Sequence, residues 1–375
     1  MQYVKKIIPA LFALILLNGC AQKNVTTRTI WKNEQANNWY SQQPWLVGCN
    51  YSPATAINQL EMWQEASFDT ATINKELGWA ASIGMNTIRV FLHDLLHQQD
   101  SAGFYKRMDT FLDIASRHNI KVMFVLFDSV WDPYPKLGKQ RDPKPHVHNS
   151  GWVQSPGLEV LKDSTQYPRL EAYVKGVVKR FADDKRVLVW DIWNEPDNIN
   201  PGSYGQLELK DKGLIVAPLL KKAFEWSRSV NPSQPLTSGI WIGDWSSHDS
   251  LKVWEKIQLD QSDIISFHNY GDPADLEKRI IQLQRYGKPL FNTEYMSRGN
   301  GSFFEGSLPI FKKYKVAAYN WGLVAGKTNT IYPWDSWDKK YTAEPELWFH
   351  DVFRQDGTPY RQSEVDFIKK ITAAN

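Results

Sequence analysis

Residues 187–196 read VLVWDIWNEP, a nearly unbroken apolar run that ends in an amide, a carboxylic acid and a proline. Short apolar runs of this kind are typical of parallel strands that are buried on both faces. Similar runs recur along the chain, over residues 45–50, 86–92, 120–127, 235–241, 264–268, 289–293 and 316–321. We therefore expect eight strands, of which residues 187–193 form the fourth.

Amphipathic stretches lie between these runs. Apolar residues recur at helical spacing over residues 104–117, 169–181, 273–286 and 363–371. Strands that alternate with helices form a parallel sheet, and eight such units predict an α/β fold of the single (β/α)8 barrel type, the TIM barrel. A doubly wound sheet is the alternative, but it requires a glycine-rich turn after an early strand, which this sequence lacks.

The longest connection follows the third expected strand. Residues 129–166 contain five prolines and show no clear periodicity. A loop of this length is uncommon unless it is functional. Segments that follow the strands of a barrel gather on the face where active sites lie, so we expect the loop on that face. A long loop there can close one end of a cleft, which would favour short or branched ligands.

The composition excludes several classes of protein. Of the 375 residues, 42% are hydrophobic and 23% are charged, which excludes a disordered or collagen-like chain. The net charge of +3 is too small to indicate a nucleic-acid partner. The 17 tryptophans are typical of a large aromatic core. They are also typical of flat surfaces on which sugar rings stack.

Residues 1–20 are typical of a secretory leader. Two lysines precede an apolar run over residues 7–17 that is too short to span a bilayer comfortably. The LNGC sequence that ends at Cys20 is similar to a bacterial lipobox, in which the cysteine becomes the lipid-modified first residue. A plain signal peptide with a chance cysteine is the alternative. Only one thiol, Cys49, then remains, so we expect no intrachain disulfide.

The residues after the leader suggest where the protein resides. Residues 21–43 are polar and predict a tether, so the folded domain is expected over residues 44–375. Ala21 lacks the aspartate that would resemble an inner-membrane retention signal, which favours the outer membrane. We expect a lipid-anchored protein of the bacterial cell envelope, either periplasmic or facing the surface.

Two of the expected strands end in a glutamate, Glu195 after the fourth and Glu294 after the seventh. A single glutamate at a strand end is more often an ordinary polar terminus. Strands four and seven, however, lie on opposite sides of an eight-strand ring, so their ends can face each other across its mouth. Cleavage of a glycosidic bond needs two such groups, an acid for the leaving oxygen and a carboxylate that attacks or activates water.

The triplet Asn194-Glu195-Pro196, with Glu294 at a strand end 99 residues later, resembles the clan A glycoside hydrolases and most closely family 5, the cellulase family. The resemblance covers residues 45–373. It is supported by three further matches at strand ends, Arg89, the His268-Asn269-Tyr270 triplet and Trp321. The chain departs from the family pattern in three places, the Phe127-Asp128 end of the third strand, residues 326–330 and the loop 129–166.

The resemblance implies roles for the two glutamates. Glu195 would be the general acid/base, and its pKa must then be raised so that it is protonated before attack. Glu294 would be the nucleophile, held ionised and oriented by Arg89 and Tyr270. If the two carboxyl groups are placed as in the clan, their separation is about 5 Å and the anomeric configuration is retained.

The resemblance also implies how a sugar would be bound. Asn194 would bind its 2-hydroxyl group, His268 would donate or accept hydrogen bonds in the same site, and Trp321 would stack on the sugar face. Arg89, Tyr270 and Trp321 each also have a purely structural interpretation. From its place just after Arg89, His93 is expected to contact substrate. About half of six further tryptophans are expected to line the cleft: Trp131, Trp152, Trp241, Trp245, Trp334 and Trp337.

Other chemistries find less support. His93, Asp94 and His97, or His146 and His148, could be read as metal ligands, but neither group has the H-E-x-x-H spacing of a zinc site. No G-x-S-x-G or Walker sequence occurs. We therefore expect neither a metal nor a cofactor.

The sequence thus predicts a monomeric retaining glycoside hydrolase that acts on a β-linked oligo- or polysaccharide of the β-glucan or β-mannan type. Two alternatives stay open. One is a non-catalytic carbohydrate-binding lipoprotein, although a binding protein would need neither carboxylate. The other is a transglycosylase on the same fold, in which a sugar replaces water as the acceptor.

Overall fold

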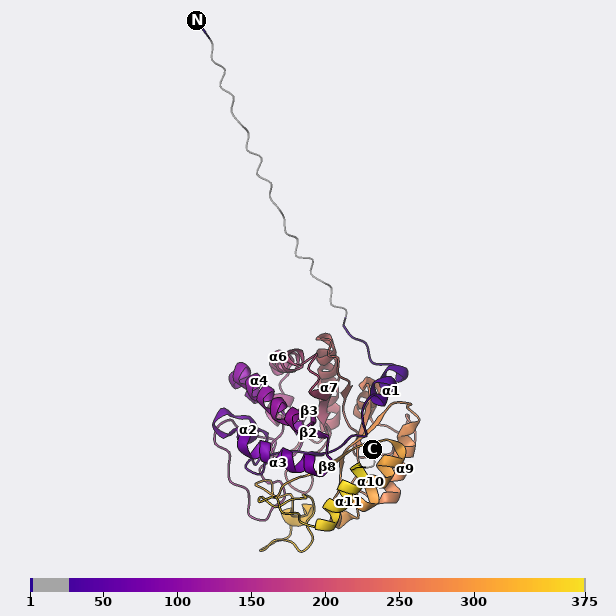
Figure 1. The fold of residues 1–375 in the computed structure, drawn as a ribbon. Helices are drawn as coiled ribbons and strands as arrows, with labels where there is room; N and C mark the ends of the chain where they lie inside the picture. The colour runs from indigo at the N-terminus through magenta and orange to yellow at the C-terminus, as the bar shows by residue number, and fades with distance from the viewer. Residues whose placement is uncertain (3–26, 374–375) are drawn as a thin grey trace.

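The computed structural model of the protein describes residues 1–2 and 27–373 (Figure 1). Residues 3–20 of the expected leader, with the lipidation site at Cys20, therefore lie outside the described residues. In the part of the chain that is described, no helix has the length and apolar character needed to cross a membrane.

The centre of the fold is a ring of strands. Among the described residues, eight parallel strands pair in the order β5-β4-β3-β2-β1-β8-β7-β6. They are β1 (Val47–Asn50), β2 (Thr87–Phe91), β3 (Lys121–Asp128), β4 (Val187–Asn194), β5 (Leu236–Thr237), β6 (Ile265–His268), β7 (Leu290–Tyr295) and β8 (Ala317–Trp321). A parallel bridge between Ile240 and Phe267 joins the segment after β5 to β6 and nearly closes the ring. The predicted (β/α)8 barrel is confirmed.

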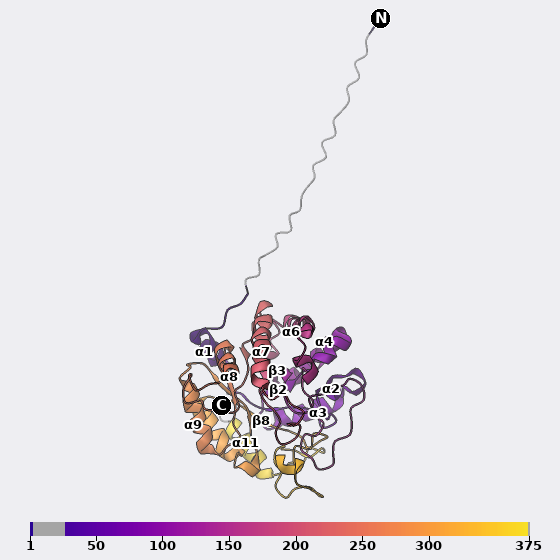
Figure 2. The ribbon, with the colours of Figure 1, turned by 180° about the vertical axis from the view of Figure 1, so that it is seen from behind.

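Helices surround the strands on the outside, as the two opposite views show (Figures 1 and 2). The longer ones are α3 (Thr70–Ser82), α4 (Asp94–Arg117), α6 (Tyr167–Arg180), α7 (Lys212–Ser229), α8 (Val253–Gln261), α9 (Pro273–Gln284), α10 (Phe304–Tyr314) and α11 (Gln362–Ala373). Short helices α2 (Gln59–Trp63) and α5 (Leu158–Leu161) lie in loops. The four helical stretches predicted from periodicity correspond to α4, α6, α9 and α11. Of these, α4 begins ten residues earlier than expected, at Asp94.

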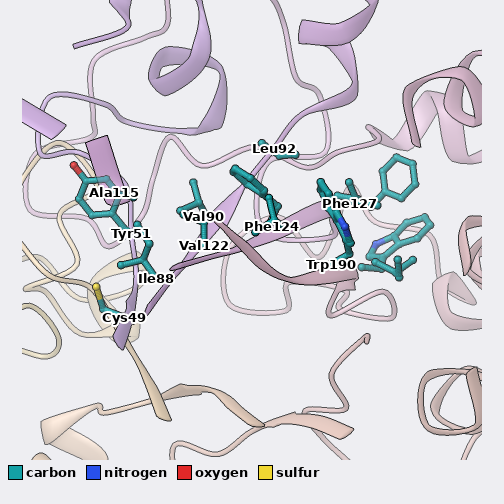
Figure 3. Close-up of a cluster of buried hydrophobic side chains, with 14 of the residues drawn as sticks. Cys49, Tyr51, Ile88, Val90, Leu92, Ala115, Val122, Phe124, Phe127 and Trp190 are labelled. Carbon is teal, nitrogen blue, oxygen red and sulfur yellow. The ribbon is translucent and has the colours of Figure 1, made fainter. Parts of the chain in front are cut away.

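The apolar layer between strands and helices decides which side chains enter the barrel. Successive side chains of a strand point to opposite faces. On β2, Ile88 and Val90 are buried in the main apolar cluster, so Arg89 between them points into the ring. Figure 3 shows part of this layer, in which the side chains of β2 lie beside those of β3. Because the side chains on the helix side of each strand are buried against the helices, the alternate side chains must point into the barrel.

The amino-terminal end of the barrel is covered by the helix α1 (Asn33–Ser41). Trp31, just before it, is 6% exposed and lies in a cluster with Leu46, Ile264 and Phe291, which stand at or just before the beginnings of strands. Amides of this segment bind the turn that precedes β7: Asn33 donates to the carbonyl oxygen of Tyr286 and Asn37 to that of Gly287.

The predicted tether over residues 21–43 is therefore wrong for its second half, and the domain begins before residue 44. The reason is a sparse pattern in a polar sequence. Ala36, Trp39 and Tyr40 are spaced as i, i+3 and i+4, which places them on one helix face. This face packs against the barrel, where the rings of Tyr40 and Phe291 lie 5.4 Å apart.

We expect Trp31→Ala to lower the free energy of unfolding by about 3 kcal/mol, because it removes a large buried aromatic side chain from the end of the barrel. Denaturant unfolding followed by circular dichroism would measure this change. Gln35→Ala, on the exposed face of α1, is the control and should stay within about 0.5 kcal/mol. Equal stability of the two variants would contradict the packing role of Trp31.

Candidate active site

One buried guanidinium lies at the centre of the carboxyl ends of the strands. The Nε and Nη2 atoms of Arg89 donate to Oδ2 of Asp191 at 3.0 and 2.8 Å, and Nη1 donates to Oε1 of Glu294 at 2.9 Å. Arg89 also donates to the side-chain oxygens of Asn50 and Asn194 at 2.8 and 2.7 Å. Hydrogen bonds from a charged donor are stronger than those between neutral groups, so these contacts hold residues of β1, β2, β4 and β7 in one arrangement.

Glu294 is bound through both of its carboxyl oxygens. Besides the contact with Arg89, its Oε2 accepts a hydrogen bond from the Tyr270 hydroxyl at 2.9 Å. Burial raises the pKa of Glu294, and the charge of Glu195 adds to this effect, whereas Arg89 and Tyr270 oppose it. Since both donors favour the charged form, they orient Glu294 as a carboxylate aimed into the mouth of the barrel.

Glu195 sits across the mouth in a different environment. Burial raises its pKa to about 7, and the one strong opposing contact is an amide, Nδ2 of Asn198 at 2.6 Å from Oε2. Nδ1 of His268 lies 2.8 Å from the other oxygen. The backbone of Glu195 is in the left-handed region at φ 44°, which is uncommon for a glutamate. This conformation turns the side chain out of the strand direction at the end of β4.

The two carboxyl groups and His268 form one compact group. One oxygen of Glu195, one of Glu294 and a ring nitrogen of His268 all lie within 4.8 Å of one another. Burial lowers the pKa of His268 to about 4, so its ring is neutral at pH 7. Three such ligand atoms resemble a metal site, but Arg89 already places a positive charge against Glu294, so a second cation would be repelled there. The arrangement fits one acid and one carboxylate working as a pair.

Asn194 is held from both ends of its amide. Its Oδ1 accepts from Arg89, and its Nδ2 donates to Oδ1 of Asp128 at 2.9 Å. Asp128 also accepts hydrogen bonds from Trp152 at 2.7 Å and from Gln59 at 3.1 Å, and burial raises its pKa to about 7. The departure from the family pattern at the third strand thus supplies the group that orients Asn194.

A cavity of about 450 Å³ opens in front of the two glutamates. Of the predicted site residues, the structure brings Glu195, Glu294, Asn194, His268, Tyr270 and Trp321 to its wall, with Arg89 directly behind. The loop that follows β3 contributes Trp131 and Asn149, so its predicted place on this face is confirmed. Volumes of this size are typical of small-molecule sites.

Four of the six further tryptophans line this cavity: Trp131, Trp241, Trp334 and Trp337. The other two are buried elsewhere. Trp152 packs edge-on against Phe91, and Trp245 packs against Phe267. About half of these six tryptophans were expected to line a cleft, and four of them line the cavity.

His93 does not reach the cavity. It is fully buried at the start of α4, where its Nδ1 accepts from the Leu95 backbone N–H at 3.2 Å and lies 3.2 Å from the Asp94 carboxylate. The side chain therefore acts as a helix cap, and the expected substrate contact is not found. It follows Arg89 closely in sequence, but the strand ends at Phe91 and the chain then turns outward into the helix.

The sequence interpretation missed several residues of the site. Asp191 could have been found from the sequence, because a carboxylate inside an otherwise apolar strand requires a buried partner. Asn198, three residues after Glu195, carried no such signal. His148 and His350 also line the cavity, but they come from long loops whose course depends on contacts between distant segments.

We expect the Glu195 carboxyl group to titrate near pH 7, and its pKa to move upward in Asn198→Ala. The amide of Asn198 favours the charged form, so its removal favours the protonated form. Carboxyl-carbon NMR of protein labelled in its glutamates would measure both values, with Glu195→Gln identifying the signal. Asn74→Ala, on the helix α3 and not part of the cavity wall, should leave the value unchanged, and a downward shift in Asn198→Ala would contradict the assignment.

Comparison with known proteins places this geometry in context. A family model described as cellulase (glycosyl hydrolase family 5) matches residues 51–340. Mannan endo-1,4-beta-mannosidase A of Emericella nidulans is 26% identical over 91 residues, which is 24% of this chain and 21% of that relative. The matched part thus spans only a fifth of the curated relative's length.

Solved structures share the fold at low sequence identity. A GH5_18 variant from Streptomyces cattleya in complex with Manβ1-4GlcNAc has a TM-score of 0.58 at 12% identity, covering 88% of this chain and 81% of that chain. An exo-beta-1,4-mannosidase from Opitutaceae bacterium strain TAV5 has a TM-score of 0.57 at 17% identity, covering 88% and 59%. The hyperthermostable endo-1,4-beta-D-mannanase from Thermotoga petrophila RKU-1 has a TM-score of 0.55 at 12% identity, covering 88% and 99%.

The family match covers well over half of the chain, and Arg89, Glu195 and Glu294 all lie within it. The barrel and its paired glutamates agree with that match. The chain therefore belongs to glycosyl hydrolase family 5, the cellulase family, and is a glycoside hydrolase.

Proposed function

We propose that the protein hydrolyses a β-linked glycoside with retention of the anomeric configuration. The observation that carries this proposal is the short distance across the mouth, where oxygens of Glu195 and Glu294 lie within 4.8 Å of each other. Retaining enzymes hold their carboxyl groups about 5 Å apart, whereas inverting enzymes leave a wider gap for a water molecule.

The environments of the two glutamates assign the two roles. Glu195 has a pKa of about 7 and can carry the proton that the leaving oxygen needs. Glu294 accepts hydrogen bonds from Arg89 and Tyr270 and is the carboxylate of the pair. In the first step, an oxygen of Glu294 bonds to the anomeric carbon while the bond from that carbon to the glycosidic oxygen breaks. The proton of Glu195 passes to the departing oxygen.

The second step returns both groups to their starting state. A water molecule attacks the anomeric carbon, its proton passes to the Glu195 carboxylate, and the bond to Glu294 breaks. Asn194, fixed between Arg89 and Asp128, presents its amide beside these two carboxyl groups. There it can bind the hydroxyl next to the anomeric carbon.

The sugar we propose is a β-mannoside, with a β-glucoside as the second choice. Relatives and neighbours whose names refer to mannanase or mannosidase activity support the first choice. The aromatic lining of the cavity supports a sugar in either case, because Trp321 offers a flat face near both glutamates.

We expect Glu294→Gln to lower kcat on an aryl β-mannoside by at least about 10⁴-fold, because an amide cannot form the covalent intermediate. Stopped assays with the purified variant would measure this loss, and circular dichroism would show that the fold is kept. Glu171→Gln, a partly exposed surface substitution on α6, is the matched control and should retain full activity.

A second readout tests the configuration directly. A 2-deoxy-2-fluoro β-mannosyl donor with a good leaving group should leave its sugar attached to the peptide that contains Glu294, as seen by mass spectrometry. NMR of the first product should show the β-anomer. Release of the α-anomer, or attachment of the sugar to another residue, would contradict the retaining assignment.

We also propose that Cys20 is lipid-modified and anchors the protein in the bacterial envelope, with the outer membrane favoured. The support is the LNGC sequence at 17–20 after a short apolar run. Expression of the full chain with a radiolabelled fatty acid should label the wild type, and Cys20→Ser should abolish the label. Equal labelling of the two proteins would contradict the proposal.

A further inference from the structure

We infer that the enzyme acts on chain ends: the cavity holds one terminal sugar, and the protein releases sugars singly from the non-reducing end. This inference rests on the proposed function, because it uses the roles of Glu195 and Glu294. It adds which part of a substrate the cavity accepts.

The roles of the two glutamates fix the direction in which a substrate lies. The acid must stand beside the leaving oxygen, so the departing part of the substrate extends past Glu195, over the segments that follow β4 and β5. The part that stays on the nucleophile extends the opposite way. In the strand order of the ring, β8 lies four positions from β4 and β1 lies four positions from β5, so the opposite side is formed by β8 and β1.

That opposite side is closed by three loops that are bound to one another. The backbone N–H of Asn149, after β3, donates to the carbonyl oxygen of Thr328, after β8, at 2.7 Å. The backbone N–H of Lys327 donates to the carbonyl oxygen of Ala54, after β1, at 3.0 Å. The ammonium of Lys327 also pairs with Glu61 of α2 at 2.7 Å. We call these connected loops the end wall.

Beneath the end wall, aromatic rings fill the space where a second sugar of the retained part would have to lie. Phe91, Trp152 and Trp321 contact one another edge-on, with ring centres 5.2 to 6.0 Å apart. The void between these rings and Thr328 has a volume of about 20 Å³. This is about the space of a single water molecule, far less than a sugar ring needs.

The other side of the cavity is open. A groove of about 690 Å³ continues past Glu195 and shares Asn198, Pro201, Trp241 and Ile242 with the cavity. Its rim carries the exposed apolar side chains Ile199, Leu214, Ile242 and Val253. A long leaving part therefore has a path out of the site, whereas a long retained part has none.

The cavity also offers unpaired polar atoms that can recognise a free chain end. In the described structure, Oδ1 of Asn149 and Nε2 of His350 are buried without a hydrogen-bond partner, and both residues line the cavity. Nδ1 of His350 lies 2.5 Å from the Met296 carbonyl oxygen and donates to it. Burial holds the pKa of His350 well below its usual range, so Nε2 is left as an acceptor. Hydroxyl groups of a terminal sugar can donate to both atoms.

The decisive experiment is hydrolysis of a β-1,4-linked mannotetraose that carries an ¹⁸O label at its reducing end, followed by mass spectrometry at early times. We expect unlabelled mannose and labelled mannotriose as the first products. Early unlabelled mannobiose or mannotriose, or labelled mannose, would overturn the inference. A tetrasaccharide whose non-reducing unit is blocked as a 4,6-O-benzylidene acetal should resist cleavage, whereas reduction of the other end should have little effect.

A variant tests the recognition of the chain end. His350→Phe keeps an aromatic ring but removes the acceptor, and we expect kcat/KM for the tetrasaccharide to fall about 10-fold or more. His118→Phe, at the opposite end of the barrel on the C-terminal cap of α4, should not change kcat/KM. An unchanged kcat/KM in His350→Phe would overturn this role.

Failure of the proposed function would give a different result. In that case the unblocked tetrasaccharide and aryl β-mannosides would yield no product, and Glu294 would not be labelled by the fluorosugar. Cleavage inside the chain together with labelled Glu294 would overturn the chain-end inference alone.

Discussion

The site depends on the ion pairs and hydrogen bonds of one buried arginine. Arg89 is completely shielded from solvent and binds Asp191 and Glu294 through charged contacts and Asn50 and Asn194 through neutral ones. A buried ion pair is costly to form from hydrated ions, but removal of one partner leaves an uncompensated charge, which typically costs 3–5 kcal/mol. Loss of the guanidinium would therefore leave the carboxyl groups of Asp191 and Glu294 buried without the positive charge that balances them.

The same arginine separates the properties of the two glutamates. Both are buried in one mouth, and burial alone would raise the pKa of each. Glu294 receives a direct contact from a positive charge, whereas Glu195 receives only the neutral amide of Asn198 and the neutral ring of His268. Two residues of one type thus stand in different electrostatic environments, because one has a cation in direct contact and the other does not.

The barrel and the core of the site could be predicted because they depend on local pattern. Apolar runs mark the strands, and parallel strands bring their carboxyl ends together, so Arg89, Glu195 and Glu294 could be placed near one another from the sequence. His93 shows the limit of this argument, because one turn of chain beyond a strand end is enough to carry a side chain away from the mouth.

Other features depend on contacts that no local pattern records. The end wall is joined by a hydrogen bond between Asn149 and Thr328, which stand 179 residues apart in the chain. The helix α1 has the polar composition of a tether, and its few apolar residues predict a packed helix only when the open end of a barrel is there to receive them. Both features are decided by tertiary packing, which overrides the polar character of the segments involved.

The position of α1 has a consequence for how the enzyme meets its substrate. The chain enters the domain beside Trp31, at the end of the barrel opposite the glutamates. Residues 21–28 can span at most about 30 Å even when fully extended. A molecule attached through Cys20 would therefore keep its amino-terminal face within about 30 Å of the lipid, with its catalytic mouth at the other end of the barrel. It would meet dissolved chain ends more readily than glycans rooted in its own membrane.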